Sequence, residues 1–135
     1  MNIAFFLTPK DSTAYLYDDY TVRQGLEKMK HHGYTSIPVV TRDNKYVSTV
    51  IEGDFLWFLL NRNPDMDMKT AEGLTVRDVL KKDKNPPVRI TATIDELVDH
   101  AVKQNFIPVL DDLDDFIGIV TRKKIIDYFY HQATK

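Results

Sequence analysis

The sequence predicts a mixed α/β protein of the α+β class, in which two pseudo-symmetric β-α-β-β-α repeats pack as one module. The chain has 135 residues, which is the length of about one domain. The tetrapeptide IPVV begins at Ile37, and IPVL begins 70 residues later at Ile107. Each copy follows a helical pattern and precedes an apolar strand pattern. A unit of this size is too small to be stable alone, so we expect the two copies to fold against each other.

The repeat also sets the predicted boundaries. Its 70-residue register holds without a gap from Ile37 to Phe58, and the helix upstream is two residues shorter in the second copy. We therefore expect a first repeat over 1–62, a linker over 63–73 and a second repeat over 74–135.

In the first repeat, Thr21 is placed to cap a helix whose apolar positions recur every three to four residues, and Gly33 is placed to end it. A short first strand is expected near 14–17. The pattern then predicts two strands joined by a polar turn, and a closing helix, in the segments SIPVV, YVSTVI and GDFLWFLLN (36–40, 46–51 and 53–61).

The second repeat has the same order of elements. Thr93 is placed to cap its first helix, and Thr75 is placed to cap a short helix before the first strand, which is expected near 87–90. We interpret DDLDD (111–115) as a polar hairpin turn rather than as a cation site. The flanking strands and the closing helix are predicted in FIPVL, FIGIV and KKIIDYFYHQ (106–110, 116–120 and 123–132).

Composition argues against several classes of function. The sequence has no Cys, its four His show no metal-ligand spacing, and its five Gly form no phosphate-binding loop. No Ser-His-Asp arrangement is legible, so we assign no catalytic residue and no metal. The pI near 6.0 argues against nucleic-acid binding, and the longest apolar run, FLWFLL, is too short to span a bilayer. With no signal-peptide pattern at the N-terminus, we expect a cytoplasmic protein.

Three consecutive cations stand where a strand gives way to a helix, in a chain whose formal net charge is −2. Arg122, Lys123 and Lys124 follow FIGIV and precede the apolar run IIDYF. Cations in the first turn of a helix oppose its dipole, at a cost of about 0.3–1 kcal/mol each when exposed. A bound phosphate would reverse this effect, because helix N-termini bind anions. The alternative is a solvated cationic face.

The doubled IPV, the doubled strand-to-helix corner and the 70-residue period together resemble a tandem cystathionine-β-synthase-type (CBS) domain pair, the Bateman module. In that family the corner usually has Gly, two apolar residues, Thr or Ser, two residues and then Asp. Here GIVTRKK has Gly118 and Thr121 but Lys124 in place of the acid. STVIEGD has Asp54 but Ile51 in place of the hydroxyl.

The resemblance implies a regulatory module without catalytic activity that binds an adenine nucleotide, of the AMP, ADP or ATP type, between the repeats. Each cleft in that family combines the first and middle strands of one repeat with the corner of the other. Cleft 1 is then expected to contain Ala14, Tyr34, Thr35, Ile37, Pro38, Ile119, Thr121, Arg122 and Lys124. Cleft 2 is expected to contain Ile51, Glu52, Asp54, Pro87, Val88, Asn105, Phe106, Ile107 and Pro108.

Cleft 1 is expected to favour a phosphorylated ligand. Ile37 and Ile119 are placed to sandwich a purine, while the hydroxyl of Thr121 and the guanidinium of Arg122 are placed to bind phosphate.

Cleft 2 has the opposite bias. The resemblance implies that Asp54 binds the two ribose hydroxyls, whereas Ile51 lacks a hydroxyl for a phosphate and Glu52 would repel one. We therefore expect cleft 2 to prefer a nucleoside or to stay empty. The alternative is that both acids only complement the helix dipole.

The segment FLWFLL is apolar on all sides, which predicts a helix that is covered on two sides. We expect one side to meet the core and the other to meet a second subunit, in a homodimer formed through Phe55–Leu60 and Ile125–Tyr130. The alternative is a wholly internal helix.

Three hypotheses for function remain open. The first is a module that senses an adenine nucleotide and signals by a change of conformation or partner. The second is a cyclic di-AMP receptor, because YTSIPVV and TRKK also resemble small stand-alone pairs that bind this ligand. The third is a ligand-free dimerisation or adaptor protein, which the incomplete corners favour. Each requires an unknown effector protein in trans or an effect on assembly.

Overall fold

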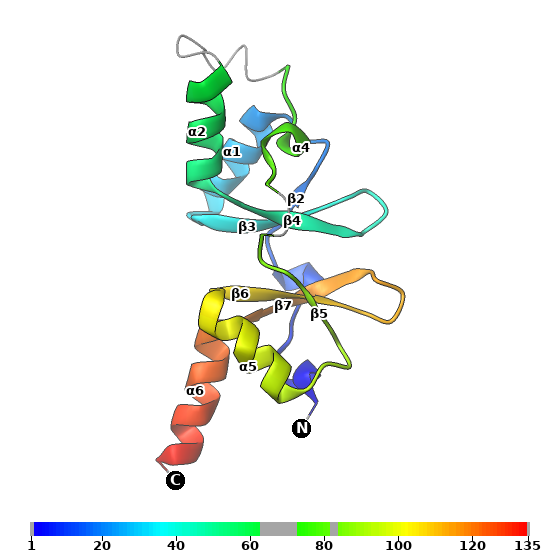
Figure 1. The fold of residues 1–135 in the computed structure, drawn as a ribbon, viewed down its shortest axis with the longest axis vertical. Coiled ribbons are helices and arrows are strands. Elements are labelled where there is room, and N and C mark those ends of the chain that lie inside the picture. Colours follow the sequence, from blue (N-terminus) through cyan, green and yellow to red (C-terminus); the bar gives the residue numbers. More distant parts are fainter. Residues whose placement is uncertain (1, 63–72, 82–83, 135) are drawn as a thin grey trace. The chain divides into compact units, whose positions relative to one another are not determined.

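The computed structural model describes residues 2–62, 73–81 and 84–134, and the chain divides into two compact units (Figure 1). The first unit is Ala14–Lys84, and the second unit is Met1–Thr13 with Asn85–Lys135. Each helix in the described part of the chain is too short or too polar to cross a membrane.

The first unit is a three-stranded sheet whose helices lie on one face (Figure 1). The strand order is β2-β3-β4, with β2 parallel to β3 and β3 antiparallel to β4. The core lies between the sheet and the helices. The elements are β2 (Leu16–Tyr17), α1 (Val22–His32), β3 (Ser36–Val40), β4 (Tyr46–Ile51), α2 (Glu52–Arg62) and α4 (Val76–Val79).

The second unit has one strand more. Its order is β1-β7-β6-β5, in which β5 is parallel to β6 and the other pairs are antiparallel. The elements are η1 (Ile3–Phe6), β1 (Thr8–Pro9), η2 (Lys10–Ser12), β5 (Val88–Arg89), α5 (Ile94–Lys103), β6 (Phe106–Leu110), β7 (Phe116–Thr121) and α6 (Arg122–Ala133).

Matching details confirm the predicted α+β fold and its repeat. The β3–β4 pair has a bulge between Val39 and Val40, and the β6–β7 pair has one between Val109 and Leu110. The two hairpin turns place Asn44 and Asp114, which are 70 residues apart, at a φ of 65°. Short polar side chains tolerate this left-handed conformation better than most residues do.

The predicted helix signals in the first repeat are confirmed. Thr21 accepts a hydrogen bond from the backbone of Gln24, whose side chain bonds back to Thr21, so that the two form a capping box. Gly33 ends α1 with a φ of 69°. In the second repeat Thr93 caps α5, and the carboxylate of Asp111 accepts two backbone N–H groups, which confirms the predicted polar turn.

The compact units differ from the boundaries that the sequence predicts. Residues 2–13 pack with the second repeat, and residues 73–81 with Lys84 pack with the first. Each unit therefore takes in the segment that leads into the first strand of the other repeat. The division of the sequence into repeats at 1–62 and 74–135 stays a prediction, and most of the linker at 63–73 lies outside the described residues.

The two lead segments, residues 2–9 and 75–81, are themselves copies of one pattern. Ile3 and Phe6 are 0% and 1% exposed in the core of the second unit. Val76 and Val79 lie 73 residues further on and are 0% and 5% exposed in the core of the first. Burying a large apolar side chain contributes about 1.5–3 kcal/mol. This gain explains why each segment stays with its unit.

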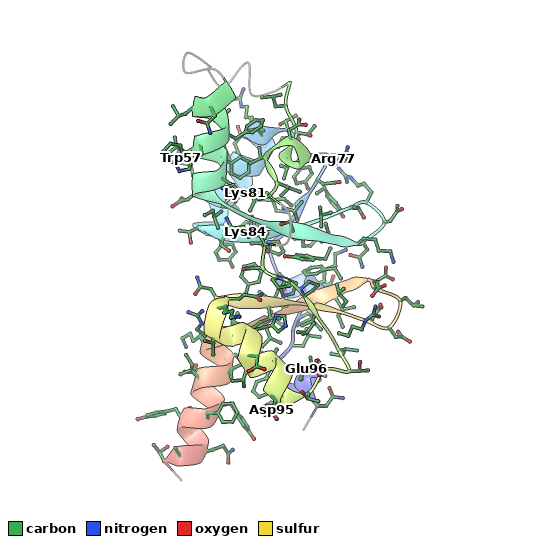
Figure 2. All side chains as sticks on the ribbon, in the orientation of Figure 1. Trp57, Arg77, Lys81, Lys84, Asp95 and Glu96 are labelled. Carbon is green, nitrogen blue, oxygen red and sulfur yellow. The ribbon has the colours of Figure 1, made fainter. Side chains whose placement is uncertain are left out.

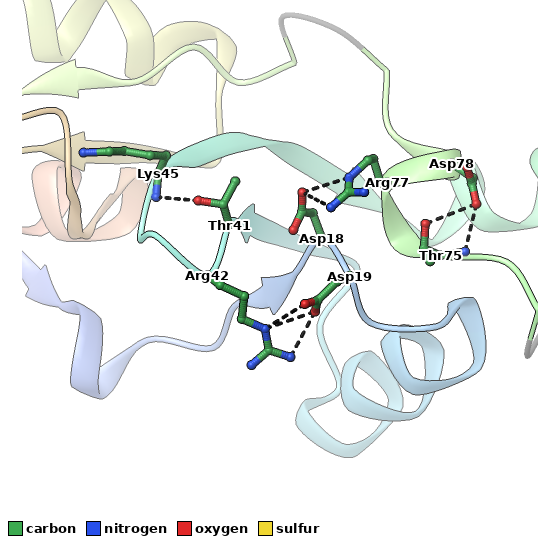
Figure 3. Close-up of polar contacts among 8 residues, drawn as sticks. All are labelled: Asp18, Asp19, Thr41, Arg42, Lys45, Thr75, Arg77 and Asp78. Atoms are coloured by element: carbon green, nitrogen blue, oxygen red, sulfur yellow. Dashed lines mark hydrogen bonds and ion pairs between the residues drawn. The ribbon is translucent and has the colours of Figure 1, made fainter.

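The second lead segment is also held by polar contacts (Figure 3). The N–H of Val76 donates to the carbonyl of Tyr20 at 2.8 Å. Arg77 forms an ion pair at 3.0 Å with Asp18, whose side chain is 9% exposed. These contacts fix α4 beside the start of α1.

The first lead segment instead joins the sheet as β1, with Thr8 opposite Ile119 and Pro9 opposite Gly118. Gly118 has a φ of +149°, which side chains rarely adopt, and the backbone of β1 occupies the space where a Cβ would stand.

We expect Gly118→Ala to lower the free energy of unfolding by about 1–3 kcal/mol, because the new Cβ would meet the Thr8 carbonyl in a strained conformation. Urea unfolding measures this loss, and amide hydrogen exchange in β7 should speed up where β1 is displaced. Gly53→Ala is the matched control, since the nearest atom is Ile51 Cδ1 at 3.8 Å. An unchanged urea midpoint for Gly118→Ala would contradict the close approach.

Candidate functional site

The two strand-to-helix corners are the candidate site. We name residues 51–54, between β4 and α2, the first corner, and residues 121–124, between β7 and α6, the second corner. The backbones match, because Glu52 N–H donates to the Thr35 carbonyl at 3.0 Å and Arg122 N–H donates to the Asn105 carbonyl at 2.8 Å. The two corners differ in their side chains.

Each corner contains one half of a capping box. In the first, the N–H of Ile51 donates to Oδ2 of Asp54 at 3.0 Å. In the second, the N–H of Lys124 donates to Oγ1 of Thr121 at 3.2 Å. A full capping box has both the hydroxyl and the acid. The two incomplete motifs of the sequence are therefore each sufficient to start a helix.

Asp54 also binds two lysines of the segment that follows α4. The ammonium of Lys84 lies 3.2 Å from Oδ1 and 3.3 Å from Oδ2, and that of Lys81 lies 3.5 Å from Oδ1. The Asp54 side chain is 2% exposed. A carboxylate this deeply buried needs paired charge and hydrogen bonds, and the two lysines with Ile51 N–H provide both.

The carbonyls of the same two lysines are bound by hydroxyl groups of β4. Ser48 Oγ donates to the carbonyl of Lys81 at 2.8 Å, and the Tyr46 hydroxyl donates to that of Lys84 at 3.0 Å. Burial raises the pKa of Tyr46 well above its ordinary value, so its hydroxyl stays protonated and can donate. Main chain and side chain together fix both lysines at the first corner. Figure 2 labels the two lysines within the first unit.

At the second corner the three cations have different environments. Arg122 Nε donates to the carbonyl of Ala101 at 2.6 Å, at the C-terminal end of α5. Lys123 pairs with Asp127 one turn along α6 at 2.9 Å. Within the described chain, the exposed ammonium of Lys124 has no acid partner. Lys124 therefore remains available to an external anion.

Each predicted cleft combines residues of both units, and the meeting of its two halves stays a prediction. The first unit contains Ala14, Tyr34, Thr35, Ile37 and Pro38 of cleft 1, and Ile51, Glu52 and Asp54 of cleft 2. The second unit contains Ile119, Thr121, Arg122 and Lys124 of cleft 1, and Pro87, Val88, Asn105, Phe106, Ile107 and Pro108 of cleft 2.

Ile37 and Ile107 are both 0% exposed within the cores of their own units. Neither residue is therefore exposed to a ligand, and the predicted purine sandwich by the Ile37 side chain is not seen. Tyr34, by contrast, is 50% exposed, and its ring stacks on that of His32 at 5.5 Å. It presents a flat surface beside the strand that begins at Ser36.

The closing helices expose apolar side chains. On α2, Trp57 is 60% exposed and projects from the helix (Figure 2). On α6, Phe129 and Tyr130 are 45% and 64% exposed. An open apolar groove of about 630 Å³ runs between α5 and α6, lined in part by Val102 and Ile126. Among the described residues, the side chains of His, Asp and Glu form no cluster that could bind a metal ion.

A model of the CBS domain matches residues 9–61 and again residues 76–131. The chain belongs to the CBS domain family. The two matches correspond to the two repeats, so the protein is a tandem CBS pair, as the resemblance implied.

Similar proteins support the same fold. The uncharacterized protein MJ1426 of Methanocaldococcus jannaschii is 25% identical over 140 residues, covering 83% of each chain. The crystal structure of CbpB in complex with c-di-AMP has a TM-score of 0.86 at 25% identity, covering 99% of this chain and 89% of that one. The crystal structure of CBSX2 in complex with AMP has a TM-score of 0.76 at 23% identity, covering 99% and 98%.

The sequence analysis of this CBS pair missed Lys81 and Lys84 as partners of Asp54. The available signal was the 73-residue spacing of the lead segments, which aligns Thr8 with Lys81. Since Thr8 lies along β7, the spacing places Lys81 along the equivalent strand β4.

We expect Arg122→Ala to lower the free energy of unfolding of this CBS pair by about 1–2 kcal/mol, because it leaves the carbonyls at the end of α5 without their cationic donor. Chemical denaturation measures the loss. Lys123→Ala is the control, since an exposed pair within one helix contributes only about 0.3–0.5 kcal/mol. Equal losses for the two variants would show that the Arg122 bond adds nothing.

Proposed function

We propose that the protein is a non-catalytic regulatory module that binds an adenine nucleotide at the second corner and signals through a change of conformation or partner. The observation that carries the proposal is the exposed Lys124 at the N-terminus of α6, beside the hydroxyl of Thr121 and without an acid partner among the described residues. The structure of CBSX2 with AMP, on the same fold, supports the ligand class. The predicted cytoplasmic location stays a prediction.

The second corner suits the phosphate end of the ligand. Thr121 Oγ1 uses a lone pair to accept from Lys124 N–H, which leaves its own hydrogen free to donate to a phosphate oxygen. The dipole of α6, a twelve-residue helix, favours negative charge at this end. A role of Arg122 is also proposed, and it requires the guanidinium to serve the phosphate besides the Ala101 carbonyl.

The purine is proposed to lie against the first unit, near Ala14 and Tyr34. Thr35, which is exposed, is proposed to supply backbone groups for the base edge, while Ile37 and Pro38 are buried. Ile119 is proposed as an apolar contact from the second unit. A ligand that contacts both units would bind with different affinity in different arrangements of the units, which is the requirement for a sensor.

A cyclic dinucleotide is the second candidate ligand. The favouring observation is the likeness over nearly the whole chain to CbpB, whose structure contains c-di-AMP. This ligand also brings phosphate and adenine together, so it would use the same second corner. Binding of neither ligand would favour the adaptor hypothesis.

We further propose a homodimer in which α2 and α6 contact a second copy. The argument is the exposure of Leu56, Trp57 and Leu60 on α2 and of Ile126, Phe129 and Tyr130 on α6. Interface cores are enriched in aromatic side chains, and patches of this kind are rarely left open to water. An effector that receives the signal in trans stays a prediction.

Titration calorimetry with AMP and adenosine tests the nucleotide site. We expect Lys124→Ala to weaken the affinity for AMP by about fivefold, which is the contribution of one exposed charge contact, and to leave the affinity for adenosine unchanged. Lys123→Ala is the control, because its ammonium is already paired with Asp127. An equal loss of affinity for AMP and for adenosine would show that Lys124 does not contact the phosphate. No binding of AMP, adenosine or cyclic di-AMP to the native protein would overturn the proposed function.

Light scattering after size exclusion tests the dimer. We expect the native protein to elute at twice the chain mass of 15.7 kDa and the Trp57→Asp variant to elute at that mass, because a charge cannot be buried unpaired in an apolar interface. Val47→Asp, which alters another exposed apolar position, should remain a dimer. A monomeric native protein at micromolar concentration would contradict the assembly.

A further inference from the structure

The contacts at the first corner leave Asp54 with few free acceptor sites. A carboxylate offers two oxygens and about four lone-pair positions. Ile51 N–H takes one position on Oδ2, Lys81 lies near Oδ1, and Lys84 lies between the two oxygens. The ammonium of Lys84 therefore sits where a single donor bridges the two carboxylate oxygens.

A ribose diol would need this same bridging position. Its two neighbouring hydroxyls donate in parallel, so they require both oxygens of one carboxylate. Ile51 N–H cannot yield its place without uncapping α2, and the remaining surface of the acid faces Lys84 and Lys81. Ribose and Lys84 are thus mutually exclusive partners of Asp54.

Lys84 is a strong competitor because its main chain is already fixed. The Tyr46 hydroxyl bonds its carbonyl at 3.0 Å, and the Lys84 side chain is only 31% exposed. A group that is tethered and preorganised acts at a high effective concentration and loses little freedom on contact. Displacing it would also leave an ammonium without its buried counter-ion.

We propose that Lys84 is the specificity-determining residue of the first corner, which excludes ribose from Asp54 and so restricts nucleotide binding to the second corner. This inference rests on the proposed function and adds to it the residue that decides which corner binds the ligand. The distribution of charge is consistent with this assignment. At the first corner the two acids Asp54 and Glu52 balance the two cations Lys81 and Lys84. At the second corner, position 124, which corresponds to position 54, carries an exposed cation.

The test is the stoichiometry of adenosine binding in Lys84→Met, which keeps the aliphatic stem and removes the ammonium. We expect the native chain to bind one adenosine and Lys84→Met to bind two. The added site should be lost in the Lys84→Met/Asp54→Asn double variant. Lys84→Arg, which retains the cation, should bind one. Lys81→Met should also bind one, because Lys81 is 64% exposed and makes a single contact at 3.5 Å.

The outcomes separate this inference from the proposed function. One adenosine bound by Lys84→Met, lost on Asp54→Asn, together with no binding of adenosine, AMP or cyclic di-AMP to the native chain, would support the inference while overturning the nucleotide site at the second corner. Two adenosines on the native chain, or the same number on the native chain and on Lys84→Met, would overturn the inference. Thermal melts of each variant confirm that a missing site does not reflect unfolding.

Discussion

Two buried apolar residues in each lead segment close the core of the unit to which that segment belongs. Ile3 and Phe6 do this in the second unit, and Val76 and Val79 do it in the first. Since each lead segment precedes the first strand of the other repeat, the chain must leave a unit and return to it. The charge balance of the first corner follows from this constraint, because Lys81 and Lys84 reach Asp54 as the continuation of the second lead segment.

The same constraint makes the two corners chemically different on matching backbones. In the second unit the lead segment pairs with β7 as a strand, and Gly118 provides the room. In the first unit, Ser48 binds the end of the lead segment to β4 and Tyr46 binds Lys84 just beyond it. Lys81 and Lys84 then neutralise Asp54. One corner is thereby satisfied within the chain, while the other keeps a cation exposed at a helix N-terminus.

Local signals in the sequence were sufficient for much of the fold. The Thr21 and Thr93 caps and the Gly33 terminus depend on neighbouring residues, and all appear as predicted. The repeat was legible from the doubled IPV alone. The non-local features were not predictable. The strand β1 has only two residues, and its partner lies more than 100 residues away. The short helix predicted after Thr75 spans Val76–Val79, and Leu80 ends it with an extended backbone at a ψ of 140°.

The predicted site is local in one part and non-local in another. Thr121, Lys124 and Asp54 stand at the corners that the motif indicated. The partners of Arg122 and Asp54 come from other segments, so charge type alone could not assign them.

Backbone amide chemical-shift mapping by NMR during an AMP titration tests the central claim most directly. The account predicts saturable shifts at residues 121–124 and near the proposed purine contacts Ala14 and Tyr34, with residues 51–54 unchanged because their acid is already occupied. Shifts centred on residues 51–54, or none at 121–124 with AMP in excess, would contradict it.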